Sequence, residues 1–254
     1  MLRRVLVVLV AAVLGGCTSG GASLAPAERP SPARSTDAPQ AAVPIVLEPL
    51  ALGADVVAVP RERFTPMWSE PSTDAHPSFR MDTRNPLGRL APMLVRRAAT
   101  LGEATWYEVL LPLRPNGTSA WVRAEDVVAR ERSERIVVDL SRRLLWRYAG
   151  DRLVARLDVG VGTAATPTGT GRFYVWVKVT YDDPSGPYGM AALGLSGFSP
   201  VLSEWPGEGR MAVHGTADPS DRGRAVSHGC VRVYNEDLAT LLDLPLGTPV
   251  IIRA

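Results

Sequence analysis

The sequence predicts a mostly β protein, with a small barrel followed by a β-sandwich and one short helix near the C-terminus. The 254 residues include 23 Gly and 22 Pro, which favours short strands and many turns over long helices. From about residue 45 onward, short apolar runs are repeatedly broken by turn signals. A chain of this length has room for one or two domains, each with its own core.

Residues 1–16 have the features of an export signal. Arg3 and Arg4 form a basic start, and the apolar run Val5–Leu14 is too short to span a bilayer. Small residues then precede Cys17, which resembles the bacterial lipoprotein cleavage box. The resemblance implies that Cys17 is lipidated, so that the protein is exported and anchored to a membrane, facing the periplasm or cell wall. The alternative is an ordinary signal peptide.

Charge argues against a nucleic-acid partner. Removing residues 1–16 takes away two arginines and no acids, so the 28 basic residues become 26 against 26 acidic ones. The mature chain is then formally neutral and lacks the basic surplus of nucleic-acid-binding proteins. Residues 17–44 are rich in Ala, Pro, Ser and Gly without apolar periodicity, which predicts a disordered linker.

Residues 45–130 are predicted to form the first domain. The candidate strands are residues 56–59, 93–95, 107–111 and 120–123, and Pro115-Asn116-Gly117 predicts the turn between the last two. The stretch from Trp106 through Gly117 to Val122 resembles the end of a bacterial SH3-like domain. Such modules often bind cell-wall peptides, and the alternative is a structural spacer. Trp106 and Trp121 are equally compatible with a core role and a binding role.

Residues 134–254 are predicted to form the second domain. Its candidate strands are residues 136–140, 144–148, 153–159, 173–179, 210–214 and 250–252. Asn235 is expected to cap a helix that places Leu238, Leu241 and Leu242 on one face. The segment 181–209 is rich in Gly, Pro and Ser and contains Tyr188, Phe198 and Trp205, which predicts a flap over the active site.

Candidate chemistry concentrates in residues 214–232. The whole chain has three histidines and two cysteines, and this window holds His214, His228 and Cys230. A thiol is a useful nucleophile only as the thiolate, so it needs a base or a positive charge nearby. Gly229 allows a sharp turn that aims backbone N–H groups at a developing oxyanion. With Cys17 lipidated, Cys230 has no partner for an internal disulfide.

Two motifs carry a family resemblance. His214-Gly215-Thr216 together with Ser227-His228-Gly229-Cys230-Val231-Arg232 resembles the paired signature of the L,D-transpeptidase catalytic domain (YkuD type), over roughly residues 134–253. Thr166-Pro167-Thr168-Gly169 resembles the Thr-Pro-x-Gly loop of that domain.

The resemblance implies a cofactor-free thiol enzyme that cross-links peptidoglycan stem tetrapeptides through a thioester acyl-enzyme. Cys230 is the implied nucleophile and His214 the base, with the Gly215 carbonyl fixing the His214 tautomer. The backbone N–H groups of His228, Gly229 and Cys230 are expected to hold the oxyanion.

Three further side chains are candidates for substrate binding. Arg232 lies two residues beyond Cys230 on the same side of a strand-like segment and is suited to hold a carboxylate bidentately. Its alternative role is a surface salt bridge. Ser227 and Tyr188 are the other two candidates, and a monomer is expected.

Three rival functions remain open at this point. His214, His228, Cys230 and Asp218 are zinc-competent, although catalytic zinc sites usually present His and Glu ligands and structural ones favour paired cysteines. A wall-binding lipoprotein keeps the fold without the chemistry. An L,D-carboxypeptidase shares the acyl-enzyme and resolves it with water.

Overall fold

The computed structural model describes residues 44–48, 55–73, 76–204 and 207–254. The predicted signal peptide, Cys17, almost all of the predicted linker and Trp205 lie outside the described residues. Residues 42–254 form one compact unit. In the described part of the chain, no helix is long and apolar enough to cross a membrane.

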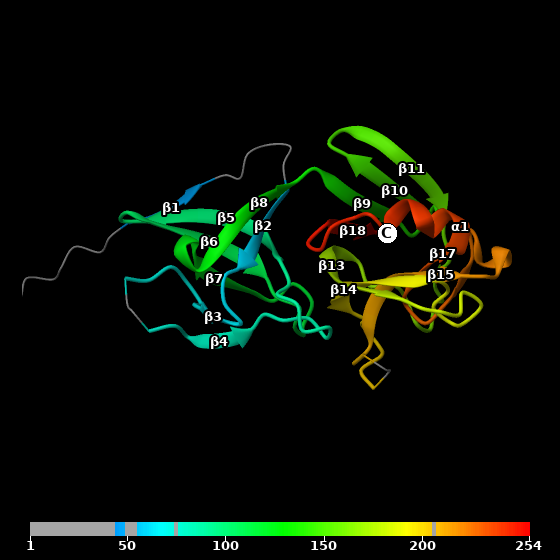
Figure 1. The fold of residues 1–254 in the computed structure, drawn as a ribbon, viewed down its shortest axis with the longest axis horizontal. Helices are drawn as coiled ribbons and strands as arrows, with labels where there is room; N and C mark the ends of the chain where they lie inside the picture. The colour runs from blue at the N-terminus through cyan, green and yellow to red at the C-terminus, as the bar shows by residue number, and fades with distance from the viewer. Residues whose placement is uncertain (1–43, 49–54, 74–75, 205–206) are drawn as a thin grey trace, which may run out of the picture. The chain divides into compact units, whose positions relative to one another are not determined.

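The first half of the unit is an antiparallel sheet with strand order β7-β6-β5-β2-β8, and β1 pairs with β5 (Figure 1). The predicted strands are confirmed, as is the turn at residues 115–117, where the Thr118 N–H donates to the Pro115 carbonyl at 3.2 Å. A separate hairpin joins β3 to β4. The bounds are β1 Ile45–Glu48, β2 Asp55–Pro60, β3 Phe64–Met67, β4 Phe79–Asp82, β5 Met93–Leu101, β6 Ala104–Leu110, β7 Ser119–Arg123, the 3-10 helix Ala124–Asp126 and β8 Val127–Arg132.

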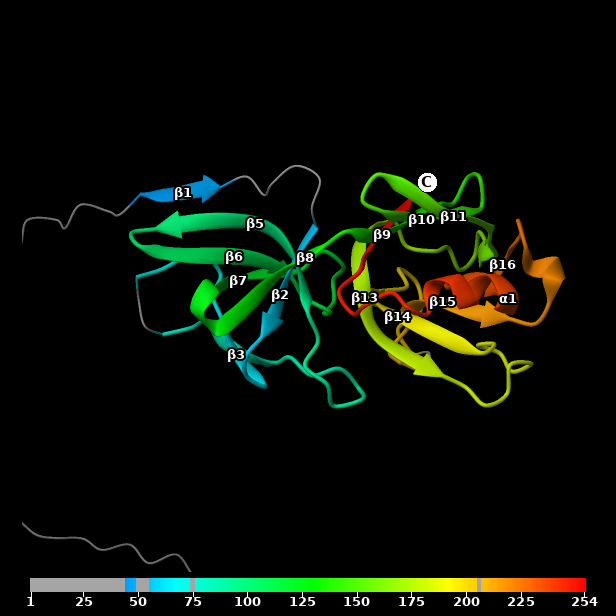
Figure 2. The same cartoon turned by 45° about the horizontal axis from the view of Figure 1, so that its top comes forward.

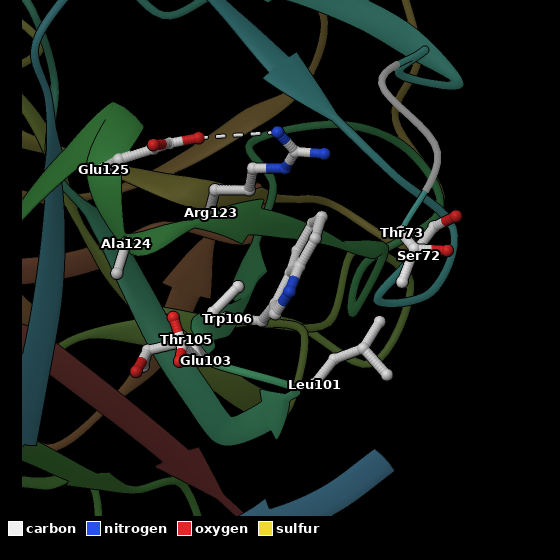
Figure 3. Close-up of a pocket in the computed structure, with 10 residues that line it drawn as sticks. Ser72, Thr73, Leu101, Glu103, Thr105, Trp106, Arg123, Ala124 and Glu125 are labelled. Carbon is white, nitrogen blue, oxygen red and sulfur yellow. Dashed lines mark hydrogen bonds and ion pairs between the residues drawn. The ribbon is translucent and has the colours of Figure 1, made fainter. Parts of the chain in front are cut away.

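Tryptophans form part of the core of this sheet. Trp68, Trp106 and Trp121 are all buried in one apolar cluster, and the rings of Trp68 and Trp106 meet edge to face at 5.0 Å. Trp106 also borders a hollow of about 520 Å³, where its ring lies beside the Arg123 side chain (Figure 3). Burial therefore gives Trp121 and Trp106 a core role. The SH3-like assignment of this domain stays a prediction.

The second half contains an eight-stranded arrangement with strand order β11-β10-β9-β18-β13-β14-β15-β17 and a separate two-stranded sheet of β12 and β16 (Figures 1 and 2). Its strands are β9 Glu134–Asp139, β10 Leu144–Ala149, β11 Arg152–Asp158, β12 Val161–Gly162, β13 Gly171–Thr180, β14 Ala191–Phe198, β15 Arg210–Thr216, β16 Ala225–Ser227, β17 Val231–Tyr234 and β18 Pro249–Arg253. The helical turns are the 3-10 helix Pro219–Asp221, α1 Asn235–Leu238 and the 3-10 helix Ala239–Leu241.

Strand β13 connects the two layers of a sandwich. Its first part, Gly171–Tyr174, pairs with β18, whereas Val175–Thr180 pairs with β14. One apolar core fills the space between the layers and includes Leu145 from one side and Val213 from the other. The predicted mostly β fold with a sandwich and a short helix after Cys230 is therefore confirmed.

The predicted flap at 181–209 is wrong over its central third. Ala191–Phe198 form β14, a buried strand between β13 and β15. Two glycines explain why this run packs so tightly. A Cβ on Gly194 would lie 2.6 Å from Val177 Cγ1, and one on Gly197 would lie 2.2 Å from Phe173 Cε1. The small residues that predicted an irregular flap make room for large side chains on β13.

The predicted capping role of Asn235 is also wrong. Tyr234 is the N-cap residue of α1, and no side chain caps this helix. The Asn235 side chain instead accepts from the Met190 N–H at 3.0 Å and donates to the Pro184 carbonyl at 2.8 Å. The predicted apolar face holds, because Leu238 and Leu241 are buried and Leu242 packs against the core.

Candidate active site

Adjacent parallel strands bring the two signature motifs together. Val213 on β15 pairs with Val231 on β17, and both side chains point into the core. Alternation along the strands then places His214 and Arg232 on the opposite face. Cys230 directly precedes β17, and the backbone N–H of Ala212, the β15 residue two positions before His214, lies close enough to the thiol to act on its pKa. The side chains of Cys230 and His214 thus lie on the same face of the two neighbouring strands.

His214 is held in one orientation. It is 3% exposed, and its Nδ1 lies 2.8 Å from the Gly215 carbonyl oxygen. A carbonyl only accepts, so Nδ1 carries the proton and Nε2 is left as the basic nitrogen. The Tyr188 ring meets the imidazole edge to face at 5.2 Å and itself stacks on Tyr181 at 5.6 Å. The predicted contact between the Gly215 carbonyl and His214 is therefore present.

Burial sets the protonation of both groups. It lowers the pKa of His214 to about 4, against the opposing effect of the Gly215 hydrogen bond, while the charge of Arg232 adds to the lowering and that of Asp221 opposes it. Burial also raises the pKa of the Cys230 thiol, against the opposing effects of the Ala212 N–H and the Arg232 charge. At neutral pH the resting pair is a thiol and a neutral imidazole.

The turn before Cys230 is closed by Ser227. Its hydroxyl donates to the Cys230 carbonyl at 2.5 Å and accepts from the Gly229 N–H at 3.1 Å, and the residue is 2% exposed. Ser227 is therefore occupied within its own loop, which argues against the predicted substrate contact. The Gly229 N–H is likewise engaged, which removes it from the predicted oxyanion donors. His228 lies exposed on the outside of the turn.

Gly229 has to be glycine. Its φ of 114° lies in the region that L side chains rarely adopt. The requirement comes from the backbone and not from space, because a Cβ there would lie at ordinary contact distances, 3.4 Å from the Pro167 carbonyl oxygen and 3.6 Å from Ser199 Oγ. The Thr166 hydroxyl of the same loop donates to the Ser227 carbonyl at 3.0 Å. The predicted Thr-Pro loop thus packs directly against the turn that carries Cys230.

Arg232 has a partner that the sequence analysis missed. Its guanidinium donates to the carboxylate of Asp221 at 3.2 Å, and Asp221 also accepts from the Thr216 hydroxyl at 2.8 Å. Asp221 is 5% exposed, so this is a partly buried ion pair and not the surface salt bridge considered above. Arg232, Thr216 and Asp221 line an open hollow of about 400 Å³. An acid in the polar run between the two motifs was the available signal.

Asn235 is the second missed residue. Through Met190 and Pro184 it fixes the loop that carries Tyr188, and a Cβ on Gly215 would lie 2.3 Å from its Oδ1. The Tyr188 loop therefore packs on the backbone of the histidine motif. No sequence pattern distinguished this role from a helix cap.

The alternative metal site is not assembled. Within residues 44–254, leaving aside the undescribed positions, no three His, Cys, Asp or Glu side chains gather closely enough to hold a metal ion. His214, His228, Cys230 and Asp218 all belong to the described part.

Comparisons with known proteins find similarity over the second half of the chain. Residues 133–252 match the family model of the L,D-transpeptidase catalytic domain, YkuD. The YkuD protein of Bacillus licheniformis is 37% identical over 119 residues, which are 46% of this chain and 64% of that relative. The YkuD protein of Bacillus subtilis is 32% identical over 119 residues, which are 46% of this chain and 65% of that relative. The chain thus spans just under two thirds of the length of these relatives.

Solved structures show weaker similarity. An L,D-transpeptidase from Mycobacterium smegmatis is 14% identical with a TM-score of 0.40, covering 83% of this chain and 100% of that one. The catalytic domain of an E. faecium L,D-transpeptidase acylated by ertapenem is 24% identical with a TM-score of 0.37, covering 48% of this chain and 98% of that one.

Proposed function

We propose that the protein is a cysteine-dependent L,D-transpeptidase that cross-links peptidoglycan stem tetrapeptides in cell-wall remodelling. The observation that carries the proposal is the hydrogen bond from His214 Nδ1 to the Gly215 carbonyl. It leaves Nε2 as a base on the same face of the sheet as Cys230. The match of residues 133–252 to the catalytic-domain family supports the same reaction.

Acylation begins when the Cys230 sulfur attacks the carbonyl between the third and fourth stem residues. As the C–S bond forms, the thiol proton moves to His214 Nε2, and the carbonyl becomes a tetrahedral oxyanion. We assign the Cys230 backbone N–H as a donor to this oxyanion, because the Gly229 N–H is bound to Ser227. Loss of one such donor typically costs about 3 kcal/mol of transition-state stabilisation.

Collapse of the intermediate breaks the C–N bond. The His214 imidazolium gives its proton to the departing amine, so that terminal D-alanine leaves as a neutral amine and a thioester remains on Cys230. An acceptor amine from a neighbouring stem then attacks the thioester. Its proton returns through His214 to the sulfur, which restores the thiol and leaves the cross-link.

Substrate contacts are assigned to the groups around this pair. Arg232 borders the open hollow with Thr216, and we propose that it holds a stem carboxylate there while it keeps its bond to Asp221. We also assign a stem contact to Tyr188, because its ring meets the His214 imidazole edge to face at 5.2 Å. The non-catalytic wall-binding alternative is disfavoured by the intact thiol, base and tautomer contact.

Product analysis tests the proposal and separates it from the carboxypeptidase alternative. Purified disaccharide-tetrapeptide is mixed with the protein and, in parallel, with Cys230→Ala. A cross-linked dimer with release of D-alanine, absent from the control, supports the transpeptidase. Tripeptide without dimer means a carboxypeptidase. Neither product would contradict both.

We further propose that the protein is exported and anchored through a lipid on Cys17, with stem peptides as its partners and no nucleic acid. Fractionation of cells tests the anchor. The parent is expected in the membrane fraction, and Cys17→Ser is expected to leave it. Equal membrane association of the two would contradict lipidation.

Size-exclusion chromatography with light scattering tests the expected monomer.

A further inference from the structure

We propose that Arg114 and Asn116, on the loop between β6 and β7, position the turn that carries Cys230. They do so by holding together the two ends of residues 199–209, the segment between β14 and β15. Both residues lie more than eighty positions before the segment that they contact. Their effect on turnover rests on the proposed function, whereas their effect on the Cys230 thiol does not.

Arg114 ties three carbonyls together. Its guanidinium donates to the carbonyl oxygens of Ser199 at 3.1 Å, Leu202 at 2.8 Å and Glu208 at 2.7 Å. Ser199 and Leu202 lie near the start of the segment and Glu208 near its end, so one side chain holds the two ends together. The guanidinium also lies over the Phe198 ring, 4.6 Å from its centroid. Arginine suits this position because its planar fork presents several donors at fixed angles.

Asn116 holds the start of the same segment. Its side-chain amide donates to the Phe198 carbonyl at 2.8 Å and accepts from the Phe198 N–H at 2.8 Å. This reciprocal pair replaces the backbone partner that a neighbouring strand would supply. Phe198 is the last residue of β14, so Asn116 fixes the point at which the chain leaves the sheet.

Ser199, next to Phe198, lies beside the turn that carries Cys230. It is 3% exposed, and its Oγ and Cβ lie 3.6 and 3.8 Å from the place that a Cβ on Gly229 would occupy. Gly229 directly precedes Cys230. A shift of Ser199 would therefore remove one of the two neighbours on this side of Gly229, and the Pro167 carbonyl would remain.

The contacts form a continuous path from the β6–β7 loop to the nucleophile. Arg114 and Asn116 hold residues 198 and 199, Ser199 lies beside Gly229, and Gly229 sets the direction of Cys230. Arg114 and Asn116 touch neither substrate nor the reacting atoms, so they are positioning residues. Displacements of about 1 Å in a catalytic group can cost up to about a hundredfold in rate.

The test uses the full chain carrying Cys17→Ser, so that Cys230 is the only thiol. Arg114→Ala, Asn116→Ala and Arg114→Lys are compared with Arg132→Ala. Arg132 is the matched control, because it donates to the Leu246 carbonyl at 3.3 Å and does not contact residues 198–209. Arg114 and Asn116 are exposed, so their loss leaves the apolar core intact. Two quantities are measured: the rate of Cys230 alkylation by iodoacetamide at fixed pH, and kcat and KM on the tetrapeptide.

Arg114→Ala and Asn116→Ala are expected to raise the alkylation rate, because a loosened turn exposes the sulfur. They are expected to lower kcat by about tenfold to a hundredfold with KM nearly unchanged. Arg114→Lys should be intermediate, and Arg132→Ala should match the parent. An unchanged alkylation rate, or an equal effect of Arg132→Ala, would overturn the proposal. If the parent proves inactive on the tetrapeptide while the alkylation rates still differ as expected, the proposed reaction fails and the positioning role stands.

Discussion

Burial moves the pKa values of Cys230 and His214 in opposite directions. In each case the shift favours the uncharged side chain. It raises the pKa of the thiol and lowers that of the imidazole to about 4. A resting thiolate–imidazolium pair would require the reverse order of the two pKa values. The proton therefore moves to His214 only as the sulfur attacks, which makes acylation dependent on the exact position of the base.

This order of pKa values predicts the pH dependence of Cys230 alkylation. In the Cys17→Ser chain, the rate with iodoacetamide should rise with a midpoint above 9.0, the ordinary value for this thiol. The thiolate is the reactive form, so a raised pKa moves the whole profile upward. Alkylation followed by intact mass from pH 5 to 11 gives the profile. A rate that is already at its plateau at pH 6 would mean an ion pair.

The lowered pKa of His214 also predicts an acid-sensitive fold. A group whose folded pKa is depressed contributes stability above its unfolded pKa of 6.5, and that stability is lost as pH falls through about 4. The fall in the pKa of His214 from 6.5 to about 4 corresponds to about 3 kcal/mol of unfolding free energy lost between pH 7 and pH 4. Urea unfolding at several pH values measures it. His214→Gln should show a shallower decline, and parallel declines would refute the assignment.

At the residue scale, the contact between His214 and the Gly215 carbonyl was predictable from the sequence, whereas the contacts of Arg232 and Ser227 were not. His214, Gly215 and Cys230 stand in short motifs whose order implies their partners. Asp221 belongs to no such motif. It accepts hydrogen bonds from Thr216 and Arg232, and only the fold brings these three residues together. Ser227 was assigned to substrate because a hydroxyl beside a nucleophile fits either role, and only its distances show the loop contact.

Strand β14 shows how an element depends on residues that do not look like a strand. Gly197 faces the Phe173 ring so closely that any side chain would have to displace it. Gly197→Ala is therefore expected to destabilise the protein by about 1–3 kcal/mol through overpacking. Thermal and urea unfolding measure the loss.

A double-mutant cycle checks the cause. The cost of Gly197→Ala should shrink in a Phe173→Leu background, because the shorter side chain frees the space. An equal cost in both backgrounds would show that the loss of stability does not come from crowding against Phe173.

Elements rich in apolar and β-branched residues were predictable, and β14 was not. β9, β10 and β13 carry runs of Val, Ile, Leu and aromatic residues that mark strands directly. β14 reads Ala-Ala-Leu-Gly-Leu-Ser-Gly-Phe, whose small residues are typical of loops. Its strand form results from pairing with β13 and β15, which a local pattern cannot contain.

On the scale of the whole unit, Tyr174 joins the two predicted domains. This β13 residue is fully buried with Val57, Leu94 and Leu110, and its hydroxyl donates to the Leu110 carbonyl at 3.3 Å. The boundary predicted near residue 130 therefore separates two sheets that share a core cluster. The sequence could not reveal this, because the two sides of the cluster are 64 or more positions apart.

The shared cluster predicts that residues 55–254 unfold together. Tyr174→Ala should cost about 3–5 kcal/mol, the usual range for deleting a large buried aromatic side chain. Hydrogen exchange followed by mass spectrometry should then show lost protection in β2, β5 and β6 as well as in β13. Loss confined to β13 and its sandwich neighbours would mean that the two sheets unfold independently.

A thioester between Cys230 and a stem peptide is the intermediate on which the proposed reaction depends, and intact-mass analysis during turnover detects it. The protein is mixed with disaccharide-tetrapeptide, quenched in acid at short times and analysed beside Cys230→Ala. We expect a transient adduct with the mass of the disaccharide-tetrapeptide less D-alanine, located on Cys230 by peptide mapping and absent from the variant. An adduct on another residue, or product formation by Cys230→Ala, would rule out the thioester mechanism.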